Sequence, residues 1–251
     1  MGWASVRRLL FIISLCFWIN GACFSGVFLA PVSHPEVISE SSAPYNTRQK
    51  ILYISEDTDA GRNGAKIVRR YFRNVGEIYY TNQWSPDEKE RRKAVRSRIA
   101  EMSYDIIISY KSDLVLLKKE LEKAGNGAIN FHPSPPEHPG LGMYVYPVLH
   151  RDERNFGGVT VHEINEKIDS GRIYETLRFS IPPHFTVDQV RDSTTRHAEE
   201  LLAQVMSRLA FFEKTTFLEN PGLRAVSWGT HTFTHADETR MMTEYDIRRA
   251  A

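Results

Sequence analysis

The sequence predicts an α/β protein built on an open, mostly parallel sheet that is flanked by helices. Short apolar runs typical of buried strands alternate with longer segments of helical periodicity from residue 50 onward. One of these runs, residues 104–109 (YDIIIS), is apolar at nearly every position, as expected in the interior of a parallel sheet. Alternating strands and helices form such sheets through right-handed crossovers, so we expect a single domain of this class.

The predicted strands are short runs rich in apolar, β-branched or aromatic residues, at residues 50–55, 77–81, 104–109, 128–131, 157–164 and 174–181. The predicted helices carry an apolar face or an end signal, such as Asp87 at an N-cap position, Gly125 after a last turn and Thr186 before a long apolar stripe. They cover residues 64–72, 87–102, 114–124, the middle of 142–151, 186–212 and a short stretch near 237–245.

Composition divides the chain into a leader and linker (residues 1–48), the α/β domain (residues 49–212) and a polar C-terminal extension (residues 213–251). The formal net charge of +1 gives no strong field that would attract nucleic acid or an anionic membrane. Both cysteines lie in the leader, so the domain has no disulfide framework and no thiolate metal site. These properties predict a cytoplasmic protein without a nucleic-acid partner.

The leader leaves three interpretations open. Two arginines precede the apolar run 9–19, which is the order of residues in a secretory signal. Asn20 and Gly21 interrupt that run, so stable membrane insertion is not expected, and Cys23 follows Gly-Ala as in a lipoprotein cleavage site. The third interpretation places the true translation start downstream.

The segment 129–134 (INFHPS) carries the strongest chemical signal. A strand that ends in Asn-x-His places Asn130 and His132 on the same side of the backbone, because strand side chains alternate. In an open α/β sheet, ligands bind outside the carboxyl ends of the strands, and this motif would lie on that rim. An amide donor beside a titratable imidazole suits a reaction that builds charge on a carbonyl oxygen and moves a proton. An ordinary polar strand-to-loop transition could carry the same residues.

A second polar cluster follows at residues 158–162 (GVTVH) and 168–173 (IDSGRI). The ordered set I-N-x-H-P-S, P-G, G-x-T-V-H and D-S-G-x-I resembles the folate-dependent formyltransferases, which include glycinamide ribonucleotide transformylase, methionyl-tRNA formyltransferase and the sugar N-formyltransferases. The resemblance covers about residues 50–209. It implies a Rossmann-like fold of formyltransferase type and 10-formyltetrahydrofolate as co-substrate. It also implies that His162 supports the site structurally rather than acting as a base.

The resemblance places the family's catalytic trio on Asn130, His132 and Asp169. When an amine attacks the formyl carbon, negative charge grows on the formyl oxygen, and the Asn130 amide can stabilise it by about 3 kcal/mol. A protonated His132 would add to this and then pass a proton to the departing folate nitrogen. Asp169 would favour the imidazolium and relay the amine proton through water. This chemistry needs no metal.

The family's folate site implies Tyr110, Ser112 and Asp169 as folate-binding residues in this sequence. Lys111 stands where many relatives have a glycine, which leaves the geometry of that loop open. On the acceptor side, Tyr144 and Trp84 are predicted to stack on a base or a sugar, although both also fit places in a core.

Departures from the family pattern indicate which acceptor to expect. Residues 56–64 (EDTDAGRNG) are acidic where glycinamide ribonucleotide enzymes resemble one another in a phosphate-cradling glycine-rich turn. About forty residues follow Leu209, too few for the C-terminal barrel of methionyl-tRNA formyltransferases, and residues 135–140 lack the arginine those enzymes tend to carry. We therefore expect an enzyme that formylates a nucleotide-linked aminosugar for surface polysaccharide (O-antigen, lipopolysaccharide) synthesis.

Three alternatives remain at this stage. The acceptor is methionyl-tRNA, or it is another small amine, or the chain is an exported binding protein that kept the fold without catalysis, for which the leader is the support. The sequence also leaves a homodimer open, because nothing in the polar extension decides between a subunit interface and packing on the sheet.

Overall fold

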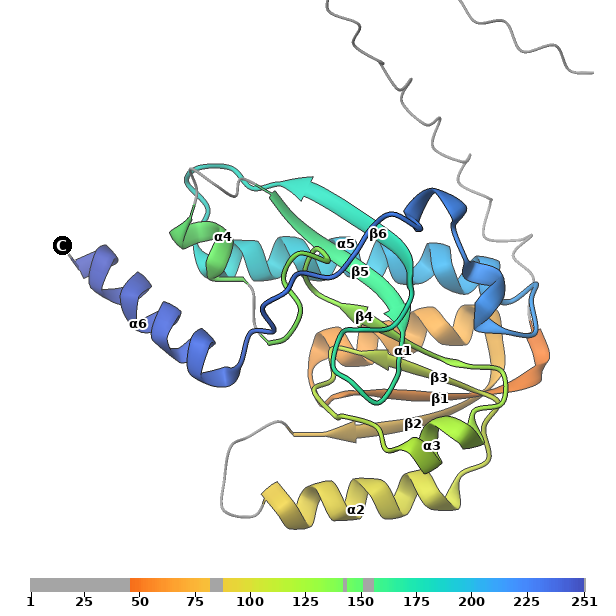
Figure 1. Ribbon diagram of the computed structural model, residues 1–251. Coiled ribbons are helices and arrows are strands. Elements are labelled where there is room, and N and C mark those ends of the chain that lie inside the picture. The colour runs from red at the N-terminus through yellow and green to blue at the C-terminus, as the bar shows by residue number, and fades with distance from the viewer. Residues whose placement is uncertain (1–45, 82–87, 142–143, 151–155, 251) are drawn as a thin grey trace, which may run out of the picture. The chain divides into compact units, whose positions relative to one another are not determined.

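The computed structural model describes residues 46–81, 88–141, 144–150 and 156–250. They form a six-stranded sheet with the strand order β2-β1-β3-β4-β5-β6 (Figure 1). The first four strands in the chain run parallel, and the last two are antiparallel to their neighbours. Their bounds are β1 Asn46–Glu56, β2 Phe72–Tyr80, β3 Ile106–Tyr110, β4 Ala128–His132, β5 Phe156–Glu163 and β6 Ile173–Ser180. The predicted open, mostly parallel sheet is confirmed.

Helices cover both faces of this sheet (Figure 1). α1 (Asp59–Tyr71) and α5 (Val187–Leu209) pack on the face that carries Ile51 and Tyr53, whereas α2 (Glu88–Glu101) and α3 (Lys118–Lys123) lie on the face of Leu52 and Ile54. Because neighbouring residues of β1 point to opposite faces, one apolar strand serves both cores. A third apolar cluster joins α4 (Tyr146–Leu149) to α6 (His235–Ala250), so the C-terminal extension packs on the domain.

Most element boundaries differ from the prediction by a few residues, and two differences have clear causes. α1 begins five residues earlier than predicted, because the Thr58 side chain accepts a hydrogen bond from the Gly61 N–H and caps the helix. β2 begins at Phe72 rather than at residue 77, because parallel pairing with β1 extends through its polar first half. Tertiary pairing overrides weak local strand propensity there.

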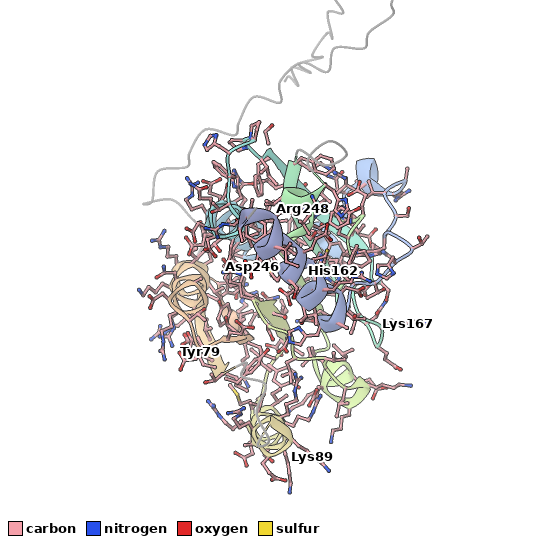
Figure 2. All side chains as sticks on the ribbon, turned by 90° about the vertical axis from the view of Figure 1, so that its left-hand side faces the viewer. Tyr79, Lys89, His162, Lys167, Asp246 and Arg248 are labelled. Atoms are coloured by element: carbon pink, nitrogen blue, oxygen red, sulfur yellow. The ribbon has the colours of Figure 1, made fainter. Side chains whose placement is uncertain are left out.

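The predicted leader and linker lie almost wholly outside the described residues, as does Trp84. No helix in the parts of the chain that the structure describes has the length and apolar character needed to cross a bilayer. Figure 2 contrasts His162, which is buried, with the exposed charged side chains of Lys89 and Lys167 at the periphery.

The close approach of α1 to the sheet depends on Gly64. A Cβ atom added there would lie 2.3 Å from the Tyr53 hydroxyl oxygen and 2.8 Å from the Tyr110 ring. We expect Gly64→Ala to lower the free energy of unfolding by about 1–3 kcal/mol, despite the better helix propensity of alanine, because both rings are held in the core. Gly125→Ala is the matched control, since no atom lies within 4 Å of its added Cβ. Chemical denaturation of both variants checks this, and equal stability would contradict the steric argument.

Candidate active site

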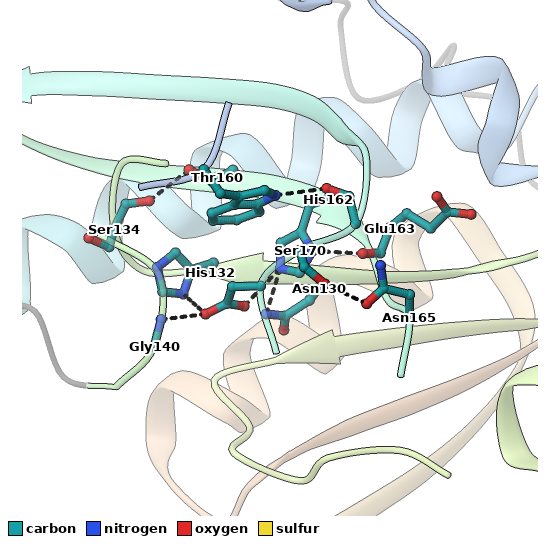
Figure 3. A network of polar contacts seen from close by, with 12 residues as sticks. Asn130, His132, Ser134, Gly140, Thr160, His162, Glu163, Asn165 and Ser170 are labelled. Atoms are coloured by element: carbon teal, nitrogen blue, oxygen red, sulfur yellow. Dashed lines mark hydrogen bonds and ion pairs between the residues drawn. The ribbon is translucent and has the colours of Figure 1, made fainter. Parts of the chain in front are cut away.

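The site lies at the carboxyl end of β4, where the sheet changes from parallel to antiparallel pairing. Asn130 and His132 are two residues apart on β4 and therefore share one side of the strand. In the antiparallel register Asn130 pairs with His162 of β5, which brings a second imidazole beside the first (Figure 3). The loop between β5 and β6 supplies Asp169. The structure thus brings together the three residues predicted as a catalytic trio and adds His162 to them.

Asp169 joins the two imidazoles. Its Oδ2 atom lies 3.3 Å from His132 Nδ1 and its Oδ1 atom lies 3.2 Å from His162 Nε2, and the Gly140 N–H donates to Oδ2 at 2.7 Å (Figure 3). At most 7% of each of the three side chains is exposed. Burial acts to raise the pKa of Asp169, but both imidazoles and the Gly140 N–H outweigh it and hold this pKa well below its ordinary value. The carboxylate is therefore ionised.

His132 has oxygen atoms at both ring nitrogens. Nε2 lies 2.8 Å from the His138 carbonyl oxygen, and Nδ1 faces Asp169. Burial lowers the pKa of His132, although Asp169 and the His138 carbonyl act to raise it. Burial thus favours the neutral ring in the free protein, and the protonation of His132 during the reaction stays a prediction. Its two oxygen neighbours are the partners an imidazolium would need once a proton arrives.

Asn130 is less buried than the two histidines of the network. Its Nδ2 atom lies 3.1 Å from His162 Nε2, while His162 Nδ1 donates to the Glu163 carbonyl oxygen at 2.7 Å. His162 Nε2 thus lies between the Asn130 amide nitrogen and Asp169 Oδ1, at 3.1 and 3.2 Å, and this contact engages at most one of the two amide N–H groups of Asn130. His162 thus orients the amide, which agrees with the supporting place expected for it.

The predicted folate residues separate in the structure. Ser112 lies at the end of β3, where its hydroxyl is 2.7 Å from the Tyr80 hydroxyl. Tyr110 is 0% exposed, with its ring against Tyr53 on one side and Phe131 on another. β3 runs one residue further than expected, which places the Tyr110 ring in the core, and the predicted contact of Tyr110 with folate stays a prediction.

Lys111 adopts the left-handed backbone conformation, with a φ of 48°, that the family's glycine would adopt without strain. Its Nζ donates to Thr195 Oγ1 of α5 at 2.7 Å, so the side chain ties this loop to the helix. Both Lys111→Ala and Lys111→Gly lose that bond. We expect the glycine variant to be more stable than the alanine variant by about 1 kcal/mol, because it alone relieves the strain. Thermal unfolding of the pair measures the difference, and an alanine variant as stable as the glycine variant would exclude strain at this position.

The predicted acceptor residues are only partly described. Tyr144 is half-buried, and the guanidinium of Arg191 lies over its ring at 5.5 Å from the centroid. Burial raises the pKa of Tyr144, so it stays a neutral aromatic surface. Trp84 lies outside the described residues, and its place in the site stays a prediction.

Sequence reasoning missed Trp228. Its indole N–H donates to the Gly171 carbonyl oxygen at 2.8 Å, and its ring centroid lies 4.8 Å from that of His162 and 5.8 Å from that of His132. No motif or periodicity marks this residue in the polar extension. Its contact with Gly171 spans 57 residues of sequence.

Comparison with known sequences agrees with the site. The family described as formyl transferase matches residues 45–206. Methionyl-tRNA formyltransferase of Ehrlichia ruminantium is 27% identical over 176 residues, covering 69% of this chain and 57% of that protein. Phosphoribosylglycinamide formyltransferase of Haemophilus influenzae is 24% identical over 163 residues, which is 62% of this chain and 76% of that protein. The chain thus spans little more than half of the methionyl-tRNA enzyme.

Solved structures share the fold. An N-formyltransferase from Helicobacter canadensis, in complex with folinic acid and dTDP-3-aminofucose, superposes with a TM-score of 0.54 at 18% identity, over 74% of this chain and 71% of that one. A formyltransferase from Anoxybacillus kamchatkensis, in complex with UDP-4,6-dideoxy-4-formamido-L-AltNAc and tetrahydrofolate, gives 0.53 at 19%, over 77% and 90%. With the fold, the site motifs and most of the domain matched, this chain belongs to the formyl transferase family.

Proposed function

We propose that this protein transfers the formyl group of 10-formyltetrahydrofolate to the primary amine of a nucleotide-linked aminosugar. The observation that carries the proposal is the buried carboxylate of Asp169, which joins the His132 and His162 imidazoles beside the Asn130 amide. This donor set suits transfer of an acyl group: an N–H for the carbonyl oxygen and a base for the amine proton. Such a reaction draws on reduced formylfolate, so we place it in the cytosol.

Asn130 stabilises the charge that develops on the formyl oxygen as the amine attacks. The amide carries two N–H donors and the contact with His162 engages at most one, so one donor is available to a ligand at this partly buried residue. A single pre-oriented donor of this kind contributes about 3 kcal/mol to lowering a barrier. His162 fixes the amide, so the donor does not need to reorganise during the reaction.

His132 moves the proton. It begins neutral, takes the proton that the attacking amine releases, and becomes an imidazolium that Asp169 stabilises. It then returns that proton to the folate nitrogen as the bond between this nitrogen and the formyl carbon breaks. One carbon–nitrogen bond forms, one breaks, and the proton passes from acceptor to donor nitrogen.

Two loops support the choice of ligands. We place the folate between the loop that begins at Lys111, with Ser112, and the loop of Asp169, at the carboxyl rim where α/β sheets bind ligands. The loop after β1 offers little charge to an acceptor phosphate, because Arg62 pairs with Asp57 at 2.6 Å. Two chains of similar fold have been solved in complex with nucleotide-linked aminosugars, which supports an acceptor of that class.

The test is incubation of the full chain with 10-formyltetrahydrofolate and, in parallel, dTDP- or UDP-linked 3-amino and 4-amino deoxysugars, glycinamide ribonucleotide and methionyl-tRNA. We expect tetrahydrofolate release with at least one aminosugar, and a formamido product with its mass. Turnover with glycinamide ribonucleotide or tRNA alone would overturn the aminosugar proposal. Absence of turnover with every acceptor would overturn the catalytic one.

One observation favours methionyl-tRNA as the second candidate. A surface hollow of about 680 Å³ between α2 and α3 is lined largely by basic side chains, namely Lys89, Arg92, Lys93, Arg96 and Lys119. Both arginines of this lining are balanced by carboxylates, since Arg92 pairs with Asp113 and Arg96 with Glu120. If methionyl-tRNA is the acceptor, charge reversal at Lys89 and Lys119 is expected to raise the KM for tRNA and to leave the KM for a small acceptor unchanged. An unchanged KM for tRNA would exclude this surface hollow as a tRNA-binding site.

A further inference from the structure

The C-terminal extension crosses the active site. We call residues 224–234 the C-terminal strap; they lie between the short helix η2 (Pro221–Leu223) and α6, beyond the residues that match the family (Figure 1). The strap follows the proline-rich loop after His132 through backbone hydrogen bonds. The Gly229 N–H donates to the Pro136 carbonyl oxygen at 2.9 Å, and the Phe233 N–H donates to that of Pro139 at 2.8 Å.

The two backbones meet too closely for side chains at two points. A Cβ atom added to Gly229 would lie 2.1 Å from the Glu137 carbonyl oxygen, and one added to Gly140 would lie 2.1 Å from that of Phe233. Gly140 also has a φ of 105°, which few other residues adopt. The strap is therefore fitted to this loop along its length.

Trp228 connects the strap to the other loop of the site. Its indole N–H bonds the Gly171 carbonyl oxygen, two residues after Asp169, and its ring lies nearly perpendicular to both His162 and His132, at 84° and 70°. Edge-to-face packing of this kind is a favourable aromatic geometry. The strap thus touches both loops that hold the network: it bonds the proline-rich loop, whose Gly140 N–H binds Asp169, and it bonds the Asp169 loop itself.

We propose that Trp228 is a positioning residue of the active site, which holds the His132–Asp169–His162 arrangement and covers one side of the imidazole pair against water. The expected effect of Trp228 on kcat rests on the proposed formyl transfer. The protection of the two imidazoles by Trp228 does not depend on that proposal. Because Trp228 covers the imidazoles, ligands approach from the side of Asn130, which, unlike the two histidines, is only partly buried. The imidazole pair and Asp169 then act in a dry, fixed arrangement.

The first test needs no activity. Diethyl pyrocarbonate modifies accessible neutral imidazoles, and mass spectrometry of peptides measures the rate at each histidine. In the unchanged protein we expect His132 and His162 to react slowly and the exposed His184 to react fast. In Trp228→Ala we expect His132 and His162 to react at least about tenfold faster, with His184 unchanged as the internal control. Trp228→Phe, which keeps a ring, is expected to restore most of the protection.

The second test uses formyl transfer once an acceptor is known. We expect Trp228→Ala to lower kcat at least about tenfold with little change in the KM for folate, and Trp228→Phe to recover part of the loss. Gly229→Ala lifts the strap with Trp228 intact and is expected to lower kcat as well. Gly222→Ala is the matched control, because its added Cβ meets only Asn220 Oδ1, at 3.2 Å.

The outcomes separate the two proposals. Unchanged protection of His132 and His162 in Trp228→Ala, or full kcat in an active Trp228→Ala enzyme, would overturn the role of Trp228. If the protein transfers no formyl group but His132 and His162 still react faster in Trp228→Ala, the proposed reaction is overturned and the role of Trp228 in covering the imidazoles is retained.

Discussion

Alanine at Asn130 is expected to lower kcat for formyl transfer by about 100- to 1000-fold and to leave the fold unchanged. In the proposed mechanism the amide is the pre-oriented donor to the developing charge on the formyl oxygen, and loss of one such donor costs about 3–4 kcal/mol in the transition state. The free energy of unfolding should change little, because the side chain is only half-buried and its protein partner is one nitrogen of His162. Single-turnover measurement with saturating folate reports the chemical step.

The companion variant His132→Ala is expected to lower kcat by about 100- to 10 000-fold, as for other general acid–base groups. His184→Ala and Asn63→Ala are the matched controls, since both side chains are exposed and far from β4 in sequence. Circular dichroism establishes that the variants are folded. Wild-type turnover in either Asn130→Ala or His132→Ala would remove the mechanism proposed above.

Asparagine at Asp169 is expected to produce the second large effect, on both stability and catalysis. The carboxylate is buried and accepts contacts from His132, His162 and the Gly140 N–H, so loss of its charge should cost on the order of 2–3 kcal/mol of folding free energy. Asp169 has a φ of 40°, and asparagine is among the residues that tolerate this conformation, so the variant tests charge rather than backbone strain.

The pH dependence has a definite sign. The pKa of Asp169 is lower in the folded protein than in the unfolded chain, so the ionised carboxylate stabilises the fold at every pH above its unfolded value of about 4. That contribution is lost as the pH falls toward the folded pKa, and Asp169→Asn should lack it throughout. Urea unfolding from pH 7 down to pH 3 measures it. Asp246→Asn on the exposed face of α6 (Figure 2) is the control, and a similar loss in both variants would contradict a special role for Asp169.

The sequence predicted the parts of the site that local patterns encode. Asn130 and His132 follow from strand alternation at the end of an apolar run, and Asp169 follows from the family's spacing. Tyr110 was expected just after a strand, but β3 ends one residue later than predicted, so its side chain lies in the core. Trp228 could not be found, because its neighbours His132 and Gly171 lie far away in sequence and its segment has no periodic pattern.

The different supports of the three catalytic candidates have a consequence for motion during turnover. Asn130 and His132 lie on β4, which is paired on both sides, and a shift of one residue would reverse every side chain of the strand, so we expect the register of β4 to stay fixed. Asp169 lies in a loop and is held from outside by Gly140 and, through Gly171, by Trp228. We therefore expect any motion during the catalytic cycle to occur in the Asp169 loop and the C-terminal strap, on the timescale of loop motions.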